Sequence, residues 1–262
     1  MIETNALTKK YGDLIAVDDL SLRVKPGEIF VFLGPNGAGK TTTIKILTGL
    51  LQPTSGKASV AGIDVVESPI EVKRIMGYLP EDPYLYDKLT GREFLQFVTD
   101  MHGVKNNQGK VDLFMELFEL SSAADELIEG YSLGMKKKVA IGAALIHDPK
   151  VLFLDEPTGG LDPKSARMMK DLLQDIRDRG NTVFMTTHIL EVAEKMCDRV
   201  GIINNGKLIK VGTIEELSEE AQETAAGSLE DIFLELTGGT QKDQISQFLD
   251  DVADPSFRKP LG

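Results

Sequence analysis

Short, predominantly apolar runs recur along the chain and predict strands that are buried on both faces of a parallel sheet. Three of these runs are Ile29–Leu33, Val151–Leu154 and Thr182–Thr187. Because neighbouring side chains of a strand point to opposite faces, such a run must be covered on both sides. A helical pattern follows, as after Lys40, where apolar residues return at helical spacing. This alternation indicates an α/β fold with a parallel sheet.

Helical spacing dominates the middle of the chain, from about residue 82 to residue 148. A capping box from Thr90 to Glu93 opens the first of two amphipathic helices, and a polar loop from Gly103 to Gly109 joins them. Ser132–Ile146 predicts a third helix. We expect this helical block to be inserted between two α/β halves, with the apolar stripes of its first two helices in the core. Those stripes are Phe94, Phe97, Val98, Met101, Val111, Phe114, Met115 and Phe118.

The two ends of the chain carry shorter signals. Residues 1–26 predict two short strands, and Asn205-Gly206 predicts the turn of a hairpin. Thr213–Glu216 and Ser228–Asp231 read as capping boxes, and the second opens a helix that Gly238-Gly239 would end. We therefore expect one domain over residues 1–238 and a weakly ordered tail over residues 239–262.

Composition is that of a soluble globular protein, and it limits the function classes. A net charge of −12 argues against a protein that binds nucleic acid broadly, because that role needs a basic surface. A single cysteine, Cys197, excludes an internal disulfide or a cysteine zinc cluster. The longest apolar run of the middle, Val139–Ile146, is too short to span a bilayer, and the N-terminus shows no signal-peptide pattern. We expect a reducing, cytosolic compartment.

The segment from Gly34 to Thr41 fits the phosphate-binding pattern G-x-x-x-x-G-K-[ST], between a predicted strand and a predicted helix. Glycines let the backbone N–H groups turn toward phosphate oxygens, and the helix N-terminus adds partial positive charge. Lys40 should reach the β- and γ-phosphates, and the Thr41 hydroxyl should ligate Mg²⁺. The residues predicted to bind the nucleotide here are Gly34, Pro35, Asn36, Gly37, Ala38, Gly39, Lys40, Thr41 and Thr42.

Two further strands end in polar residues suited to the same chemistry. About 115 residues beyond Lys40, a strand ends in Asp155 and Glu156. Asp155 would hold Mg²⁺, and Glu156 could polarise a water for attack on the γ-phosphate. His188 ends the next strand, and the carboxyl ends of parallel strands share one edge, so it should lie near Gly34 and Asp155. The alternative is that the two acids are strand-end caps and the histidine is structural.

Tyr11 lies between the first two predicted strands and is followed by a glycine. An amphipathic aromatic here could stack on an adenine ring. Alternatively, Tyr11 is a half-exposed packing residue.

These motifs together resemble the ATP-binding subunit of an ATP-binding cassette (ABC) transporter, over about residues 1–238. Seven landmarks occur in the order that the family has. They are the adenine-stacking Tyr11, the Walker A loop Gly34–Thr41, Glu81 in the Q-loop, the signature Tyr131–Met135, Walker B with its catalytic glutamate at Leu152–Glu156, Gly160–Asp162 in the D-loop, and the switch histidine His188.

Two landmarks depart from the family's pattern. Glu81 stands where the family has glutamine, and a carboxylate can ligate Mg²⁺ or hold water but cannot donate hydrogen bonds as an amide does. The signature, usually Leu-Ser-Gly-Gly-Gln, keeps Ser132 and Gly134 but has Leu133 and Met135. We expect a working site, because the hydroxyl and the helix N-terminal amides that would face a phosphate remain.

A basic run, Lys136–Lys138, follows the signature. Cations in the first turn of a helix oppose its dipole, and a nearby triphosphate would compensate in part. We interpret each of the three lysines as part of a solvated basic face.

The resemblance implies a P-loop NTPase fold of the ABC-ATPase type. Such a fold has a RecA-like parallel sheet core, an antiparallel β subdomain and an inserted α-helical subdomain. It also implies ATP and Mg²⁺ as cofactors, with Thr41, Glu81 and Asp155 at the metal.

The resemblance further implies a composite site made by two nucleotide-binding subunits, identical or different, that face head to tail. Each ATP would lie between the Gly34 loop of one subunit and the Ser132 and Gly134 of the other, with Asp162 nearby. Binding of ATP closes such a dimer, and hydrolysis reopens it.

The partner implied is a separate membrane-spanning permease, with this chain peripheral on the cytoplasmic face of the membrane. Tyr84–Tyr86, just after Glu81, is an apolar, aromatic patch suited to that contact; the alternative is that it packs against the helical block. Glu81, the degenerate signature and the predicted last helix are most similar to cassettes of drug, polysaccharide or ABC-2 exporters, and an importer stays open.

Two other classes remain as alternatives. A soluble ABC ATPase acting on ribosomes or DNA usually has two cassettes or a long coiled-coil or zinc insertion, and this chain shows neither. A small-molecule kinase or GTPase would not explain Tyr131–Met135, and the guanine-reading N-K-x-D pattern is absent.

Overall fold

The computed structural model describes residues 1–223, 230, 233, 234 and 237. The chain forms two compact units, Met1–Ile214 and Glu215–Gly262. Helix α8 (Ile214–Glu223) begins directly after Thr213, the first residue of a predicted capping box. The second predicted capping box, apart from Glu230, and the predicted tail lie outside the described residues. The domain boundary at residue 238 therefore stays a prediction.

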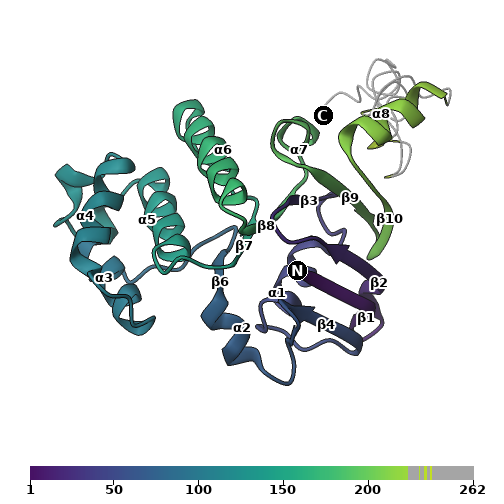
Figure 1. Cartoon of the computed structure of the whole chain (residues 1–262), viewed down its shortest axis with the longest axis horizontal. Helices are drawn as coiled ribbons and strands as arrows, with labels where there is room; N and C mark the ends of the chain where they lie inside the picture. The colour runs from purple at the N-terminus through teal and green to yellow at the C-terminus, as the bar shows by residue number, and fades with distance from the viewer. Residues whose placement is uncertain (224–229, 231–232, 235–236, 238–262) are drawn as a thin grey trace, which may run out of the picture. The chain divides into compact units, whose positions relative to one another are not determined.

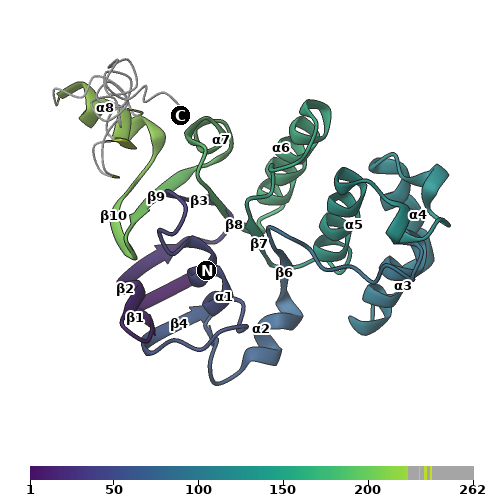
Figure 2. The ribbon, with the colours of Figure 1, turned by 180° about the vertical axis from the view of Figure 1, so that it is seen from behind.

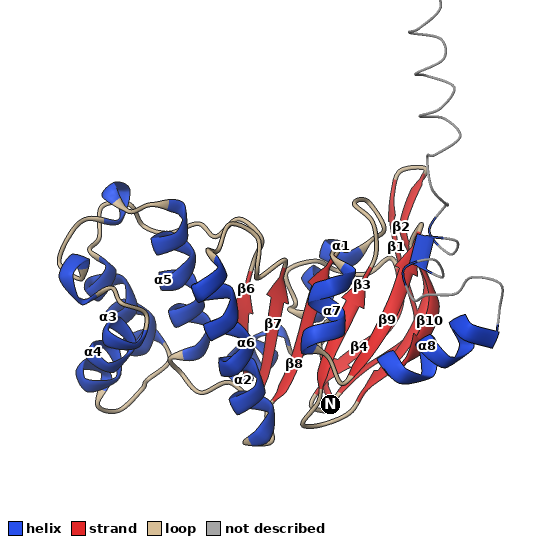
Figure 3. Ribbon diagram, turned by 90° about the horizontal axis from the view of Figure 1, so that it is seen from above, coloured by secondary structure: helices blue, strands red, loops and turns tan. Residues whose placement is uncertain are grey.

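The main sheet has six strands in the order β10-β9-β3-β8-β7-β6. The five from β9 to β6 are parallel, and β10 is antiparallel to β9. Asn205 (φ 48°) and Gly206 (φ 78°) form the tight turn of the predicted hairpin. Figure 3 shows the six strands in this order. They are β3 (Ile29–Leu33), β6 (Met76–Leu79), β7 (Val151–Asp155), β8 (Thr182–Thr187), β9 (Arg199–Asn204) and β10 (Lys207–Gly212).

A second, antiparallel sheet has the order β2-β1-β4-β5. Its two N-terminal strands are longer than the short strands predicted. Register shifts break the β1 pairing with both neighbours, and Ala6 adopts a positive φ of 49° there. The strands are β1 (Ile2–Tyr11), β2 (Leu14–Val24), β4 (Ser55–Val60) and β5 (Ile63–Asp64).

Helices cover both faces of the main sheet. Helix α1 (Lys40–Leu47) contacts β7 and also β2 and β4, so it packs between the two sheets. Helices α6 (Pro163–Asp178) and α7 (Leu190–Met196) contact β3 and β8. The sequence patterns missed α2 (Pro69–Ile75), which has a single fully buried side chain.

The segment between β6 and β7 is helical, as predicted, and Figures 1 and 2 show its helices beside β6 and away from β1, β2 and β4. The capping box forms: Glu93 N–H donates to the Thr90 hydroxyl at 3.1 Å, and Thr90 N–H donates to the Glu93 carboxylate at 2.9 Å. The elements are α3 (Gly91–Met101), α4 (Asn107–Leu117), two short 3₁₀ turns (Ser121–Ala123 and Ile128–Gly130) and α5 (Leu133–Leu145).

Two residues assigned to the core stripes are exposed. Phe97 is 42% exposed and Met101 is 72% exposed. The buried face of α3 contains Phe94, Leu95 and Thr99, so these two residues fall on its flank. The Phe97 ring instead packs edge-on against Tyr86, with centroids 5.9 Å apart.

The core of the main sheet is aromatic. Phe184 of β8 packs against Phe30, Phe32 and Phe153, with ring centroids 5.7, 5.6 and 5.8 Å apart. All four rings are fully buried. Because they come from three adjacent parallel strands, they fix the relative positions of β3, β8 and β7.

The contact of β6 with α5 depends on a glycine. A Cβ at Gly77 would lie 1.9 Å from the Ala144 carbonyl oxygen. We expect Gly77→Ala to lower the free energy of unfolding by about 1–3 kcal/mol, since the backbone of α5 must move. Gly130→Ala is the control, because nothing lies within 4 Å of its added Cβ, and it should stay within about 0.5 kcal/mol of wild type. Urea unfolding measures both, and equal midpoints would refute the argument.

Candidate functional site

The carboxyl ends of β3, β8 and β7 bring the predicted polar residues to one edge of the main sheet. The Gly34 N–H donates to the Thr187 carbonyl at 3.2 Å, and the Glu156 N–H donates to the Thr186 carbonyl at 3.3 Å. His188 directly follows β8, and its Nδ1 lies 3.0 Å from Glu156 Oε1. Strand pairing alone therefore places the glycine loop, the acids and the histidine together.

A cavity of about 430 Å³ opens at this edge. It joins the glycine loop to residues distant in sequence, including Tyr11, Glu81 and Glu156. Leu14 and Ala16 also line it, and no motif marks them beyond their closeness to Tyr11 in the chain. The lining residues are Tyr11, Leu14, Ala16, Asn36, Gly37, Ala38, Gly39, Lys40, Thr41, Thr42, Glu81 and Glu156.

The conformation of the loop requires its glycines. Gly39 has φ 105° and immediately precedes α1, and a Cβ there would lie 2.3 Å from the Ala16 carbonyl oxygen. A Cβ at Gly34 would lie 2.3 Å from the Ile203 carbonyl oxygen. The loop is thus pressed between β2 and β9, with the N-terminus of α1 facing the cavity.

Lys40 is almost fully buried, and its ammonium is held inside the loop. Its Nζ donates to the carbonyls of Gly34 at 2.7 Å and Pro35 at 3.2 Å. The same Nζ lies 3.5 Å from Glu156 Oε1. A buried ammonium is stable only when such partners surround it. The Lys40 ammonium can exchange these carbonyls for anionic oxygens, which are stronger acceptors.

The two acids at the end of β7 differ in their surroundings. Asp155 is fully buried, and the Thr186 hydroxyl donates to its Oδ1 at 2.5 Å. Its Oδ2 is buried and has no hydrogen-bond partner. Burial, and then the charge of Asp155, raises the pKa of Tyr78. Glu156 has φ 47°, a left-handed conformation that is uncommon for a residue other than glycine.

Tyr11 is half exposed at the mouth of the cavity. Lys9 Nζ lies 5.1 Å from the centre of its ring. The ring is therefore accessible for stacking on an adenine, as predicted, and it is also half exposed, as the alternative of a packing residue predicts. The position alone does not separate the two roles.

The signature and D-loop residues lie elsewhere. Ser132 caps α5 and accepts from the Met135 N–H at 3.3 Å, while Asp162 caps α6 and accepts from the Ser165 N–H at 2.9 Å. The Ser165 hydroxyl also donates to Asp162, at 2.6 Å, and this bond together with the one from the Ser165 N–H holds the pKa of Asp162 below its usual range. None of Ser132, Gly134 and Asp162 lines the cavity.

The interpretation of Lys137 as part of a solvated basic face is wrong. Lys137 is only 4% exposed, and its Nζ donates to the carbonyls of Glu156 at 2.9 Å and Gly159 at 2.7 Å. Burial lowers its pKa, and nearby carboxylates oppose that effect. Lys136 is half-buried and pairs with Asp87 at 3.0 Å. Three consecutive lysines show no alternation of polar and apolar residues, so the sequence does not indicate which of them faces inward.

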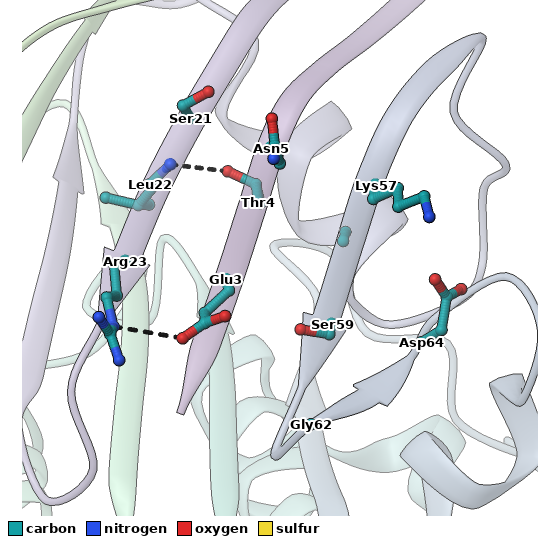
Figure 4. A pocket seen from close by; sticks show the side chains of 11 residues that line it. Glu3, Thr4, Asn5, Ser21, Leu22, Arg23, Lys57, Ser59, Gly62 and Asp64 are labelled. Atoms are coloured by element: carbon teal, nitrogen blue, oxygen red, sulfur yellow. Dashed lines mark hydrogen bonds and ion pairs between the residues drawn. The ribbon is translucent and has the colours of Figure 1, made fainter.

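A larger cavity, of about 690 Å³, lies on the antiparallel sheet between β1, β2 and β4. Figure 4 shows its polar lining, including the ion pair of Arg23 with Glu3 at 3.2 Å and the hydrogen bond from Leu22 N–H to Thr4. Arg23 and Glu3 are both strongly exposed. None of the predicted site residues lines this cavity, so size alone does not identify the site.

The link from Thr186 to Asp155 can be tested by stability. Thr186→Val keeps the shape of the side chain but removes the donor to the buried carboxylate, so we expect a loss of about 1–3 kcal/mol in unfolding free energy. In an Asp155→Asn background the same substitution should cost less, since a neutral amide is cheaper to leave unpaired. Urea unfolding of the four proteins measures both costs, and an equal cost in both backgrounds would refute the link.

The chain is similar in sequence and in fold to known proteins. The sequence model of the ABC transporter family matches residues 17–159, more than half of the chain. YbhF of Escherichia coli, a probable multidrug ABC transporter ATP-binding protein, is 39% identical over 94% of this chain and 43% of its own length. The bacitracin transport ATP-binding protein BcrA of Bacillus licheniformis is 41% identical over 80% of this chain and 69% of its own length.

A solved structure described as the ATP-binding subunit of an ABC transporter matches with a TM-score of 0.84 and 31% identity. The match covers 90% of this chain and 99% of that one. The chain spans less than half the length of YbhF, and no helix within its described residues is long and apolar enough to cross a membrane. The match to the family model and the similarity along nearly all of that ATP-binding subunit lead to one conclusion: the chain belongs to the ABC transporter family, as one of its ATP-binding cassettes.

Proposed function

We propose that this chain hydrolyses ATP as one half of a nucleotide-binding dimer and powers transport through a separate membrane-spanning permease. The observation that carries the proposal is the cavity at the carboxyl edge of the main sheet. It joins an amide-rich loop and a buried lysine to a carboxylate and an exposed aromatic ring. Its volume of about 430 Å³ suits a small-molecule ligand.

In this arrangement the phosphates of ATP lie along Gly34–Thr42 and the adenine stacks on Tyr11. The Lys40 ammonium exchanges its carbonyl contacts for the more strongly accepting phosphate oxygens. The N-terminus of α1 adds the partial charge of its unpaired amides.

A magnesium ion fits the acids present. Asp155 Oδ2 is buried without a partner and is thereby an available oxygen ligand. Within the described residues no group of three or more acidic, histidine or cysteine side chains could hold a metal. Mg²⁺ needs no such group, because it binds one or two protein oxygens and completes its shell with phosphates and water. Asp155, Thr41 and Glu81 would hold it, and it would neutralise charge on the β- and γ-phosphates.

In this proposal Glu156 acts as the general base. Its carboxylate accepts a proton from the water that attacks the γ-phosphate. His188 Nδ1 and Lys40 Nζ both lie near Oε1, at 3.0 and 3.5 Å, and they limit the directions in which the carboxylate can point. His188 is half exposed and can also contact the γ-phosphate.

One subunit alone leaves the site incomplete. Ser132 is exposed at the N-terminus of α5, outside the cavity that holds the glycine loop. A second subunit, identical or different, would bring its own Ser132, Gly134 and Asp162 to the first subunit's nucleotide. ATP then binds the closed dimer better than the open one, and this difference drives closure.

Export is the proposed direction, and the names of the relatives support it. YbhF is described as a probable multidrug ABC transporter ATP-binding protein and BcrA as a bacitracin transport ATP-binding protein. Tyr84 is 99% exposed and Tyr86 is 61% exposed, close in sequence to Glu81, and they offer a contact for the permease on the cytoplasmic face of a membrane. No nucleic-acid partner is proposed, given the net charge of −12.

The base assignment predicts the behaviour of Glu156→Gln. This variant should bind ATP but hydrolyse it about 100-fold or more slowly, because the amide cannot take the proton. It should also accumulate as an ATP-bound dimer, visible by light scattering. Phosphate release measures turnover, with the exposed Glu126→Gln as the control. Wild-type turnover in Glu156→Gln would remove Glu156 from the mechanism.

The composite site predicts the behaviour of Ser132→Arg. A long cation at this exposed position should block closure, while a monomer still binds a fluorescent ATP analogue with its normal affinity. Combined with Glu156→Gln, it should abolish the ATP-induced dimer. Ser121→Arg, an exposed serine in the same helical segment, is the control and should dimerise normally. Normal dimerisation of the Ser132→Arg combination would contradict a shared site.

A further inference from the structure

Lys137 is a buried cation that the mechanism above does not use. It lies on α5, five residues beyond Ser132, and its side chain reaches the turn that follows β7. Its Nζ donates to two carbonyl oxygens of that turn, Glu156 O at 2.9 Å and Gly159 O at 2.7 Å. Burying an ammonium has a large desolvation cost, which these two hydrogen bonds offset in part. The same two bonds also restrain the backbone of the turn.

The consequence lies in the backbone of Glu156. A left-handed conformation at a residue other than glycine is strained and persists only where its surroundings fix it. On the amide side, the Glu156 N–H is held by Thr186, through the carbonyl at 3.3 Å and the hydroxyl at 3.2 Å. On the carbonyl side, Glu156 O accepts from the Gly159 N–H at 3.3 Å and from Lys137.

We infer that Lys137 is a positioning residue for ATP hydrolysis: by holding the carbonyls of Glu156 and Gly159, it fixes the peptide conformation that aims the Glu156 carboxylate. The inference rests on the proposed role of Glu156 as the base. Without the ammonium, the Glu156 carbonyl keeps only the local turn contact from Gly159. The peptide can then rotate, and the carboxylate leaves the position set by His188 and Lys40.

The chemistry of the contact indicates what can replace the lysine. Both acceptors are neutral carbonyls, so the requirement is for two N–H donors at the end of a long side chain, not for a charge. A glutamine amide has two donors. Methionine has similar length and none, and asparagine has two donors on a stem that is one carbon shorter than that of glutamine.

The test compares Lys137→Met and Lys137→Gln with wild type in steady-state ATPase assays. Lys137→Met should lower kcat about 10- to 100-fold, the scale expected for a misplaced catalytic group. Its KM for ATP and its affinity for a fluorescent ATP analogue should change less than about twofold, because Lys137 does not line the cavity. Lys137→Gln should keep kcat within about threefold of wild type, since it retains the donors.

Lys136→Met is the matched control, because it removes the same charge from the neighbouring position on α5. Its Nζ pairs with Asp87 and not with the turn after β7. We expect wild-type kcat and KM. Should Lys137→Met fail to fold, Lys137→Asn takes its place and should show the same loss of kcat with unchanged ATP affinity.

Three outcomes would overturn the inference. They are a wild-type kcat in Lys137→Met, a loss of activity matched by an equal loss of ATP affinity, or a Lys137→Gln variant as slow as Lys137→Met. Glu156→Gln assayed in the same series separates this failure from failure of the base assignment. If Glu156→Gln is inactive while Lys137→Met is fully active, only the role of Lys137 fails; if Glu156→Gln is fully active, the base assignment fails first.

Discussion

The site depends on how β8 holds the end of β7. The Thr186 hydroxyl binds the Asp155 carboxylate, and its carbonyl and hydroxyl both accept from the Glu156 amide. One residue of the sheet core thereby fixes two consecutive acids. The register of the parallel pair, which places Asp155 opposite Thr186, follows from the aromatic packing around Phe184. The geometry of the acids is therefore a property of the whole sheet and not of a mobile loop.

The two buried lysines at this edge are held mainly by neutral backbone carbonyls and not by the carboxylates near them. Lys40 and Lys137 are both buried within reach of the end of β7, yet most of their hydrogen bonds go to backbone carbonyls. The ion pair between Lys40 and Glu156 is a loose 3.5 Å contact. Because its closest contacts are neutral carbonyls, the Lys40 ammonium can turn to a polyanion without breaking a strong ion pair.

The sequence predicted which polar residues share one edge of the sheet, because these residues follow the ends of strands. An apolar run followed by glycine, acid or histidine identifies a strand end, and parallel pairing then brings such ends together. It failed for α2, where a seven-residue helix with only Val72 buried leaves no periodic pattern. It failed for Phe97 and Met101 because period alone does not show which side of a helix meets its neighbour. The burial of Lys137 was not predicted, because its partners are backbone carbonyls, which every residue has whatever its side chain.

The same edge concentrates features that weaken a fold. Asp155 keeps one buried oxygen without a partner, and Glu156 adopts a left-handed backbone. Each feature is unfavourable in isolation, and a sequence chosen for stability alone would contain neither. They persist because rigid neighbours leave no alternative: β8 on one side, and α5 with its buried lysine on the other. The unpaired Asp155 oxygen is available as a ligand, and the fixed turn holds the Glu156 carboxylate in one direction. The local loss of stability therefore corresponds to preorganisation, which hydrolysis of a phosphoanhydride requires.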